Sequence, residues 1–217
     1  MRKLIKLIVL LAFVFEGCVT AKEYVIEGRI DGNARLYLCV MNEHGKLDTI
    51  QQVMAQNGKF QMKGSIEGDR IAFLTVQDRK GRIPLMLKDT IVSVDIRKNE
   101  LSDGRNFTAP GGVLQNRKDA LDQKEIEIYR NRDSVLVRIS KAEKEHNLLR
   151  RMHEMASLQV MDEIYDKEED RLIQENRDNI LGLYLVYYRY SYLNYERLKL
   201  KFDVLSERMK DSPEGRL

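Results

Sequence analysis

The sequence has 217 residues, which is long enough for one or two domains with a sizeable hydrophobic core. Hydrophobic residues make up 43% and charged residues 33% of the chain, a balance that excludes predominant disorder. The net charge of +3 gives no electrostatic basis for a nucleic-acid partner, and two cysteines are too few for a disulfide scaffold or a cysteine-based zinc site.

The first 21 residues have the pattern of a secretory signal peptide. A basic start, Met1–Lys6, precedes an uncharged apolar run from Leu7 to Phe15. This run is too short to span a bilayer, which takes about 20 apolar residues. We therefore expect an exported protein, either periplasmic or an outer-membrane lipoprotein, with no transmembrane helix in the mature chain.

Two cleavage sites are compatible with this signal. The residues at 19–21 suit an ordinary signal peptidase, which would leave Lys22 as the new N-terminus. The residues at 15–18 resemble a bacterial lipobox, which would place lipid on Cys18, although Phe15 and Glu16 depart from the usual pattern. A lipid anchor at Cys18 is the membrane attachment we expect under the second alternative, because the chain from residue 22 onward has a net charge of only +1.

Residues 22–111 have the periodicity of short strands. Asn57-Gly58 between two extended runs is a strong signal for a hairpin. Pro84 cannot donate to a ladder, so it should lie on an edge strand or at a bulge. Strands are predicted at 24–30, 36–41, 49–55, 59–64, 71–76, 83–87 and 90–96. Seven short strands at this spacing predict an antiparallel β-sandwich-like domain.

A segment rich in turn-forming residues, 103–112, predicts a domain boundary near residue 111. Helical periodicity follows, with no proline until Pro213, and the charged residues of both signs indicate solvated helix faces. Asn179 and Asn194 are each placed to cap a further helix. The predicted fold class is α+β, with a β-sandwich-like domain at 22–111 followed by an antiparallel helical domain at 112–217.

Tyrosines concentrate near the C-terminus of the predicted helical domain. Packing of their helix against neighbouring helices explains this cluster, and so does a protein interface, where tyrosine is enriched. Both interpretations stay open. The candidate interface residues are Tyr184, Tyr187, Tyr188, Tyr192 and Tyr195.

The sequence contains no complete catalytic constellation, and we expect neither a cofactor nor a metal. Besides Cys18, the one other thiol is Cys39. It lies in an apolar run, which predicts a buried small hydrophobic residue rather than a reactive group.

The order of several features resembles a known family. These features are the strand Tyr24–Ile30, the turn and strand Asn57–Gly64, the apolar segment Ile83–Leu87 and the C-terminal stretch Leu205–Gly215. Together they resemble the N-terminal domain of unknown function that precedes the thioredoxin-like domain in exported AhpC/TSA-type thiol-disulfide oxidoreductases of Bacteroidetes. The resemblance covers about residues 22 to 215.

In that family a Cys-x-x-Cys pair in the thioredoxin-like domain carries the redox chemistry. This sequence contains no such pair, so the resemblance transfers no catalytic residue. We expect a non-catalytic cell-envelope module that binds a protein partner or forms a homodimer. Two alternatives remain: an accessory half of a periplasmic disulfide reductase whose thioredoxin domain is lost or separately encoded, and a ligand-binding lipoprotein.

Overall fold

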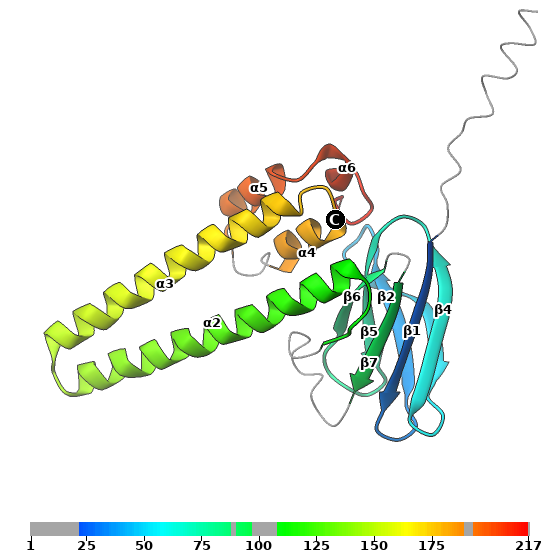
Figure 1. Cartoon of the computed structure of the whole chain (residues 1–217), viewed down its shortest axis with the longest axis horizontal. Helices are drawn as coiled ribbons and strands as arrows, with labels where there is room; N and C mark the ends of the chain where they lie inside the picture. The colour runs from blue at the N-terminus through cyan, green and yellow to red at the C-terminus, as the bar shows by residue number, and fades with distance from the viewer. Residues whose placement is uncertain (1–21, 88–89, 97–107, 189–192, 217) are drawn as a thin grey trace, which may run out of the picture.

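The strands of the N-terminal half form two sheets that face each other (Figure 1). A computed structural model describes residues 22–87, 90–96, 108–188 and 193–216. One sheet has the strand order β4-β1-β7 and the other the order β3-β2-β5-β6. The strands are β1 (Lys22–Ile30), β2 (Arg35–Met41), β3 (Leu47–Met54), β4 (Lys59–Ile66), β5 (Arg70–Val76), β6 (Ile83–Leu87) and β7 (Thr90–Ile96).

The predicted sandwich is confirmed, and each strand begins and ends within two residues of its expected bounds. Pro84 lies on β6, which is an edge strand, as its missing N–H requires. One pairing departs from the antiparallel expectation, because β1 and β7 run parallel, with Tyr24 opposite Thr90 and Ile30 opposite Ile96. Alternation along a strand indicates which face is buried but not the direction of the neighbouring strand.

The turn at Asn57-Gly58 forms, but the hairpin predicted around it is wrong. Both residues have left-handed backbone conformations, with φ values of 52° and 72°. However, β3 pairs with β2 and β4 pairs with β1, so the turn carries the chain from one sheet to the other. Beside the turn, the N–H of Ile30 donates to the carbonyl of Gly58 (2.8 Å) and the N–H of Ala55 to that of Ala34 (2.9 Å). These bonds to other segments take the place of a continued β3–β4 ladder.

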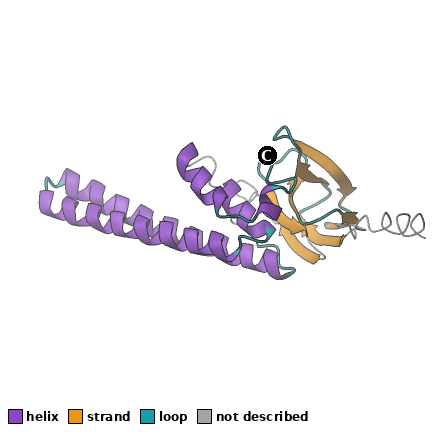
Figure 2. Cartoon of the chain, turned by 90° about the horizontal axis from the view of Figure 1, so that it is seen from above, coloured by secondary structure: helices purple, strands orange, loops and turns teal. Residues whose placement is uncertain are grey.

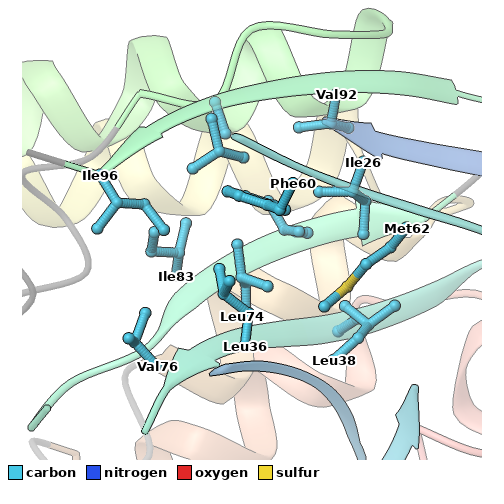
Figure 3. Close-up of a cluster of buried hydrophobic side chains, with 14 of the residues drawn as sticks. Ile26, Leu36, Leu38, Phe60, Met62, Leu74, Val76, Ile83, Val92 and Ile96 are labelled. Carbon is cyan, nitrogen blue, oxygen red and sulfur yellow. The ribbon is translucent and has the colours of Figure 1, made fainter. Parts of the chain in front are cut away.

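The space between the sheets is filled by aliphatic and aromatic side chains from both (Figure 3). One sheet contributes Ile26, Phe60, Met62, Val92 and Ile96, and the other contributes Leu36, Leu38, Leu74, Val76 and Ile83. Burial of this apolar surface is the main favourable contribution to folding of the sandwich.

Helices make up the C-terminal half, as expected. They are α2 (Val113–Lys144), α3 (Leu148–Glu175), α4 (Ile180–Tyr188), α5 (Tyr195–Asp203) and α6 (Glu207–Lys210). The expected caps are present, since the side chain of Asn179 accepts from the N–H of Leu181 (3.0 Å) and that of Asn194 from the N–H of Arg197 (2.9 Å).

Two of these helices form an arm, and the other three return to the sandwich. Helices α2 and α3 run antiparallel and project far beyond the rest of the molecule in both views (Figures 1 and 2). The chain reverses at the tip of this arm, where His146 has a left-handed φ of 53°. The side chain of Asn147 then caps α3 by accepting from the N–H of Arg150 (3.0 Å).

A second core joins the sandwich to the helices. Strand β5 is buried on both faces: Ala72 and Leu74 point into the sandwich, and Ile71 and Phe73 point toward the helices. The helical side of this second core contains Ile173, Ile180, Leu181, Leu183, Tyr184, Val186, Leu205 and Met209. The sheet that contains β5 is therefore covered on both faces, and the base of the helical part packs on the sandwich as a third layer.

Gly28 on β1 lies at a tight contact within the sandwich. It lies opposite Phe60 on β4, and a Cβ at this position would lie 2.2 Å from the carbonyl oxygen of Val94 and 2.7 Å from the Phe60 ring. Gly28→Ala should therefore lower the free energy of unfolding by about 2 kcal/mol, measured by urea denaturation. The neighbouring exposed residue provides the control, because Glu27→Ala should change that free energy by less than about 0.5 kcal/mol. Equal effects of the two substitutions would contradict this account of Gly28.

Candidate functional site

A buried polar cluster attaches the first turns of α2 to the sandwich. The side chain of Gln115 accepts from the N–H of Met86 on β6 (2.8 Å) and donates to Asp119 (2.9 Å). Asp119 also accepts from the N–H of Ala109 (2.6 Å). These bonds satisfy the backbone N–H groups of two segments of the sandwich and determine where the arm begins.

Lys118 lies at the centre of this cluster and is 0% exposed. Its ammonium group is 3.0 Å from a carboxylate oxygen of Asp119 and 3.0 Å from one of Asp122. A buried ammonium is tolerated only when it is paired in this way. Because its members bond to one another and to the backbone of the sandwich, the geometry of the cluster indicates attachment of the arm.

The arm projects from this attachment and is held together mainly by ion pairs between α2 and α3. Lys124 pairs with Glu168 (2.7 Å), and Arg138 pairs with Glu154 (2.8 Å). Further ion pairs join Arg132 to Asp162 and Arg151 to Glu143. Such partly exposed pairs contribute only about 0–1 kcal/mol each.

Few apolar residues are buried along the arm. Among the described residues from 123 to 165, Val135 and Ala142 are the buried ones. The stability of a helix in a protein comes mostly from packing of its apolar face. Packing between α2 and α3 therefore contributes little to the stability of the arm, and apolar surface stays uncovered.

That uncovered surface is concentrated toward the tip of the arm. We call it the arm patch: Leu136, Val137, Leu148, Leu149, Met152, Met155, Val160 and Ile164, all of them exposed. These eight are half of the sixteen large hydrophobic residues that are exposed in the described part of the chain. A concentration of exposed hydrophobic residues is typical of interaction surfaces, whereas scattered ones are ordinary.

A groove of about 470 Å³ runs beside the arm patch between α2 and α3. Ile128, Met161 and Ile164 form its apolar lining, and Lys124 and Arg171 lie at its margin. Both of these cations are paired with Glu168, at 2.7 Å and 2.9 Å. Those bonds lower the pKa of Glu168 to about 2, so the ion pairs persist at neutral pH.

The predicted tyrosine residues fall into different environments. Tyr184 is 2% exposed and belongs to the second core, where its hydroxyl lies 3.4 Å from a carboxylate oxygen of Asp122. Tyr187 is partly buried, and its hydroxyl contacts the sulfur of Met41 (3.2 Å). Next to Tyr187 is a cavity of about 20 Å³, room for one water molecule.

The remaining candidate residues are not part of the second core as the structure describes it. Tyr195, at the start of α5, is 77% exposed. Tyr188 ends α4, Tyr192 lies outside the described residues, and so does Cys18, the candidate lipidation site. The structure thus brings Tyr184 and Tyr187 together in the second core and leaves Tyr195 on the surface.

The arm patch is a surface that the sequence analysis did not single out. A signal for it was present, because Leu148 and Leu149 are adjacent on a helix and cannot both face α2. The periodicity of apolar residues indicates that a face exists, but not whether the molecule itself covers that face.

The described residues also show the surroundings of Cys39 and whether metal-binding groups or membrane spans are present. Cys39 is a buried free cysteine whose sulfur lies 3.6 Å from the hydroxyl of Thr49. The described part of the chain holds no group of three or more histidine, cysteine, aspartate or glutamate residues arranged for a metal ion. None of its helices combines the length and apolar character that a membrane span requires.

Comparison with known families gives a match over the sandwich and the start of α2. Residues 24–118 match the family model described as "Domain of unknown function (DUF4369)". The DUF4369 match continues past β7 to Lys118, so it includes the first turns of α2, where Gln115 and Lys118 are buried. No curated protein and no solved structure matches the chain.

The buried cluster around Lys118 predicts how the free energy of unfolding depends on pH. Burial raises the pKa of Asp122 from 3.8 to about 6, although the neighbouring Lys118 ammonium lowers it. Because this pKa is higher in the folded than in the unfolded state, protonation of Asp122 contributes to stability. The contribution is fully present below about pH 4 and is lost as the pH rises through about 6. Relative to wild type, Asp122→Asn should therefore gain about 2 kcal/mol of unfolding free energy between pH 4 and pH 7.

Urea denaturation at both pH values measures this shift. The matched control is Asp133→Asn on the exposed face of the same helix, for which the difference from wild type should stay constant. A difference between wild type and Asp122→Asn that is equal at pH 4 and pH 7 would contradict the assignment.

Proposed function

We propose that this chain is a non-catalytic, exported module of the cell envelope that binds another protein chain through its helical arm. The observation that carries this proposal is the arm patch, eight exposed hydrophobic residues between Leu136 and Ile164. The DUF4369 sandwich and the second core form the base of the module. Export is supported by the signal pattern of residues 1–21.

The composition of the arm supports binding rather than catalysis. Its groove is lined by aliphatic side chains and by ion-paired Lys124, Glu168 and Arg171. A catalytic site needs an acid, base or nucleophile free to act on a substrate, whereas these charges are engaged with each other. Apolar residues bordered by charges are typical of a protein interface.

A thioredoxin-like domain is a second candidate partner. The sequence resembles domains that precede such a domain in exported thiol-disulfide oxidoreductases, and the DUF4369 match covers the sandwich portion of that resemblance. Under this proposal the chain serves as an accessory half and the thioredoxin-like partner supplies the reactive thiols, because Cys39 is buried here.

Size-exclusion chromatography with light scattering tests the interaction proposal. Residues 22–217 contain every described residue and would be run alone and with a thioredoxin domain from a longer relative. We expect a species larger than one chain in at least one of the two runs. A chain that stays monomeric and captures no added domain would contradict an interaction function.

A further inference from the structure

We propose that α3 pairs antiparallel with α3 of a second copy of this chain, about a twofold axis near residue 158. This inference rests on the proposed interaction function and names its partner. A twofold contact uses the same surface on both copies, so the surface must be complementary to itself. Three properties of the arm meet that requirement.

The first property is a row of exposed residues along α3, which we call the outer row. It consists of Leu149, His153, Ala156, Val160, Ile164 and Lys167. These residues are three or four positions apart and therefore share one helix face. In α3, Glu154, Met161 and Tyr165 take part in the contact with α2 or line the groove beside it, which leaves the outer row free.

The outer row is close to symmetric about residue 158. In an antiparallel pair centred there, Ala156 lies opposite Val160 of the other copy and Leu149 lies opposite Lys167. His153 falls within one residue of the level of Ile164 of the other copy. Ala156 and Val160 therefore meet next to the axis, and Lys167 lies at the margin of the contact, as in a protein interface with a polar rim.

The second property is the separation of charge along the arm. The distal half, residues 131–160, has six basic and four acidic residues. The proximal half, residues 113–130 and 161–175, has six basic and eleven acidic residues. Antiparallel pairing places the positive half of each arm against the negative half of the other, whereas parallel pairing would place like charges together.

The third property is the area available. At the proposed register α3 overlaps its copy over residues 148–168, a length of about 31 Å, and two adjacent helices are about 20 Å wide. One side of the arm therefore offers about 600 Å², which is at the lower end of what each partner contributes to a stable interface. Three arm-patch residues, Leu149, Val160 and Ile164, supply apolar side chains to this area.

The groove between α2 and α3 fits this arrangement. Its members Ile164, Lys167 and Arg171 lie on the same side of α3 as the outer row. At the proposed register they lie beside Leu149 of the other copy, which is 82% exposed. Each copy thus presents one apolar tip and one apolar groove, and the twofold axis joins each tip to a groove.

The opposite edge of α3 is already covered within the chain. Arg197 of α5 pairs with Asp166 (2.7 Å), and Lys201 pairs with Glu169 (3.2 Å) and Asp170 (2.6 Å). Burial raises the pKa of Glu169, as expected for a carboxyl group held beneath α5. Helix α5 therefore closes one side of the arm and leaves the outer row as the side open to a second copy.

Val160→Glu tests the interface directly. Val160 is 55% exposed and lies opposite Ala156 of the other copy, next to the axis. Because the contact is twofold, one substitution places two carboxylates close together against small and apolar residues, and the dimer dissociation constant should rise about 100-fold. Light scattering on residues 22–217 would then show one chain in place of two. The matched control is Leu200→Glu on α5, which is 69% exposed and lies off the outer row, so its variant should remain dimeric.

A charge exchange tests the register. Ile164→Lys places a lysine beside His153 of the other copy and should dissociate the dimer. Adding His153→Glu should recover about tenfold of the lost affinity through new Glu–Lys pairs. Positions 153 and 164 are about 16 Å apart along one helix, so this rescue cannot arise within one chain.

The outcomes separate this inference from the function on which it rests. A wild-type dimer that Val160→Glu and Ile164→Lys each disrupt, and that the double variant Ile164→Lys/His153→Glu partly restores, supports the α3 pairing. A dimer unaffected by Val160→Glu overturns the pairing but leaves the interaction function standing. A monomer that captures an added thioredoxin domain likewise overturns the pairing but keeps the interaction function. A monomer that binds neither a second copy nor a thioredoxin domain overturns both the pairing and the interaction function. Circular dichroism of each variant shows that a lost dimer is not a lost fold, since the substituted residues are exposed.

Discussion

The position of the arm depends on one buried charge. Lys118 is fully enclosed at the junction of α2 with the sandwich, and its ammonium is paired with Asp119 and Asp122. Removing either carboxylate leaves part of a buried charge uncompensated, which is costly in an apolar interior. The same cluster binds the backbone of Met86 and Ala109 through Gln115 and Asp119. The direction of α2, and with it that of the whole arm, follows from this attachment.

Stability and function are separated along the length of the molecule. The two apolar cores lie between the sheets and between β5 and the helices, and both are well filled. Beyond them the arm relies on ion pairs such as Arg138–Glu154 and on two buried residues, Val135 and Ala142. Hydrophobic residues are left exposed where intramolecular packing ends. A second copy that covers the outer row would supply the burial that the single chain lacks.

The strands could be predicted because alternation is a local property. Phe60 and Met62 alternate with polar neighbours, which predicts a strand, and Pro84 predicts an edge position. Both predictions can be made without knowing the partner strand. The partners themselves were harder to predict. The turn at Asn57-Gly58 has the expected backbone conformation, yet it connects two sheets, because the adjoining segments bond to other neighbours. The parallel pairing of β1 with β7 is likewise a matter of topology, which strand periodicity does not encode.

Local patterns were enough to predict the α+β class, the seven strands, the helical half and the helix caps at Asn179 and Asn194. Each of these features rests on side chains and backbone groups that are close together in the chain. Which apolar faces are covered depends instead on how distant segments pack. This packing placed Tyr184 in the second core and left Leu149 exposed on the arm. Both residues lie on helices with apolar neighbours, and their different burial depends on whether another element of the chain packs over them.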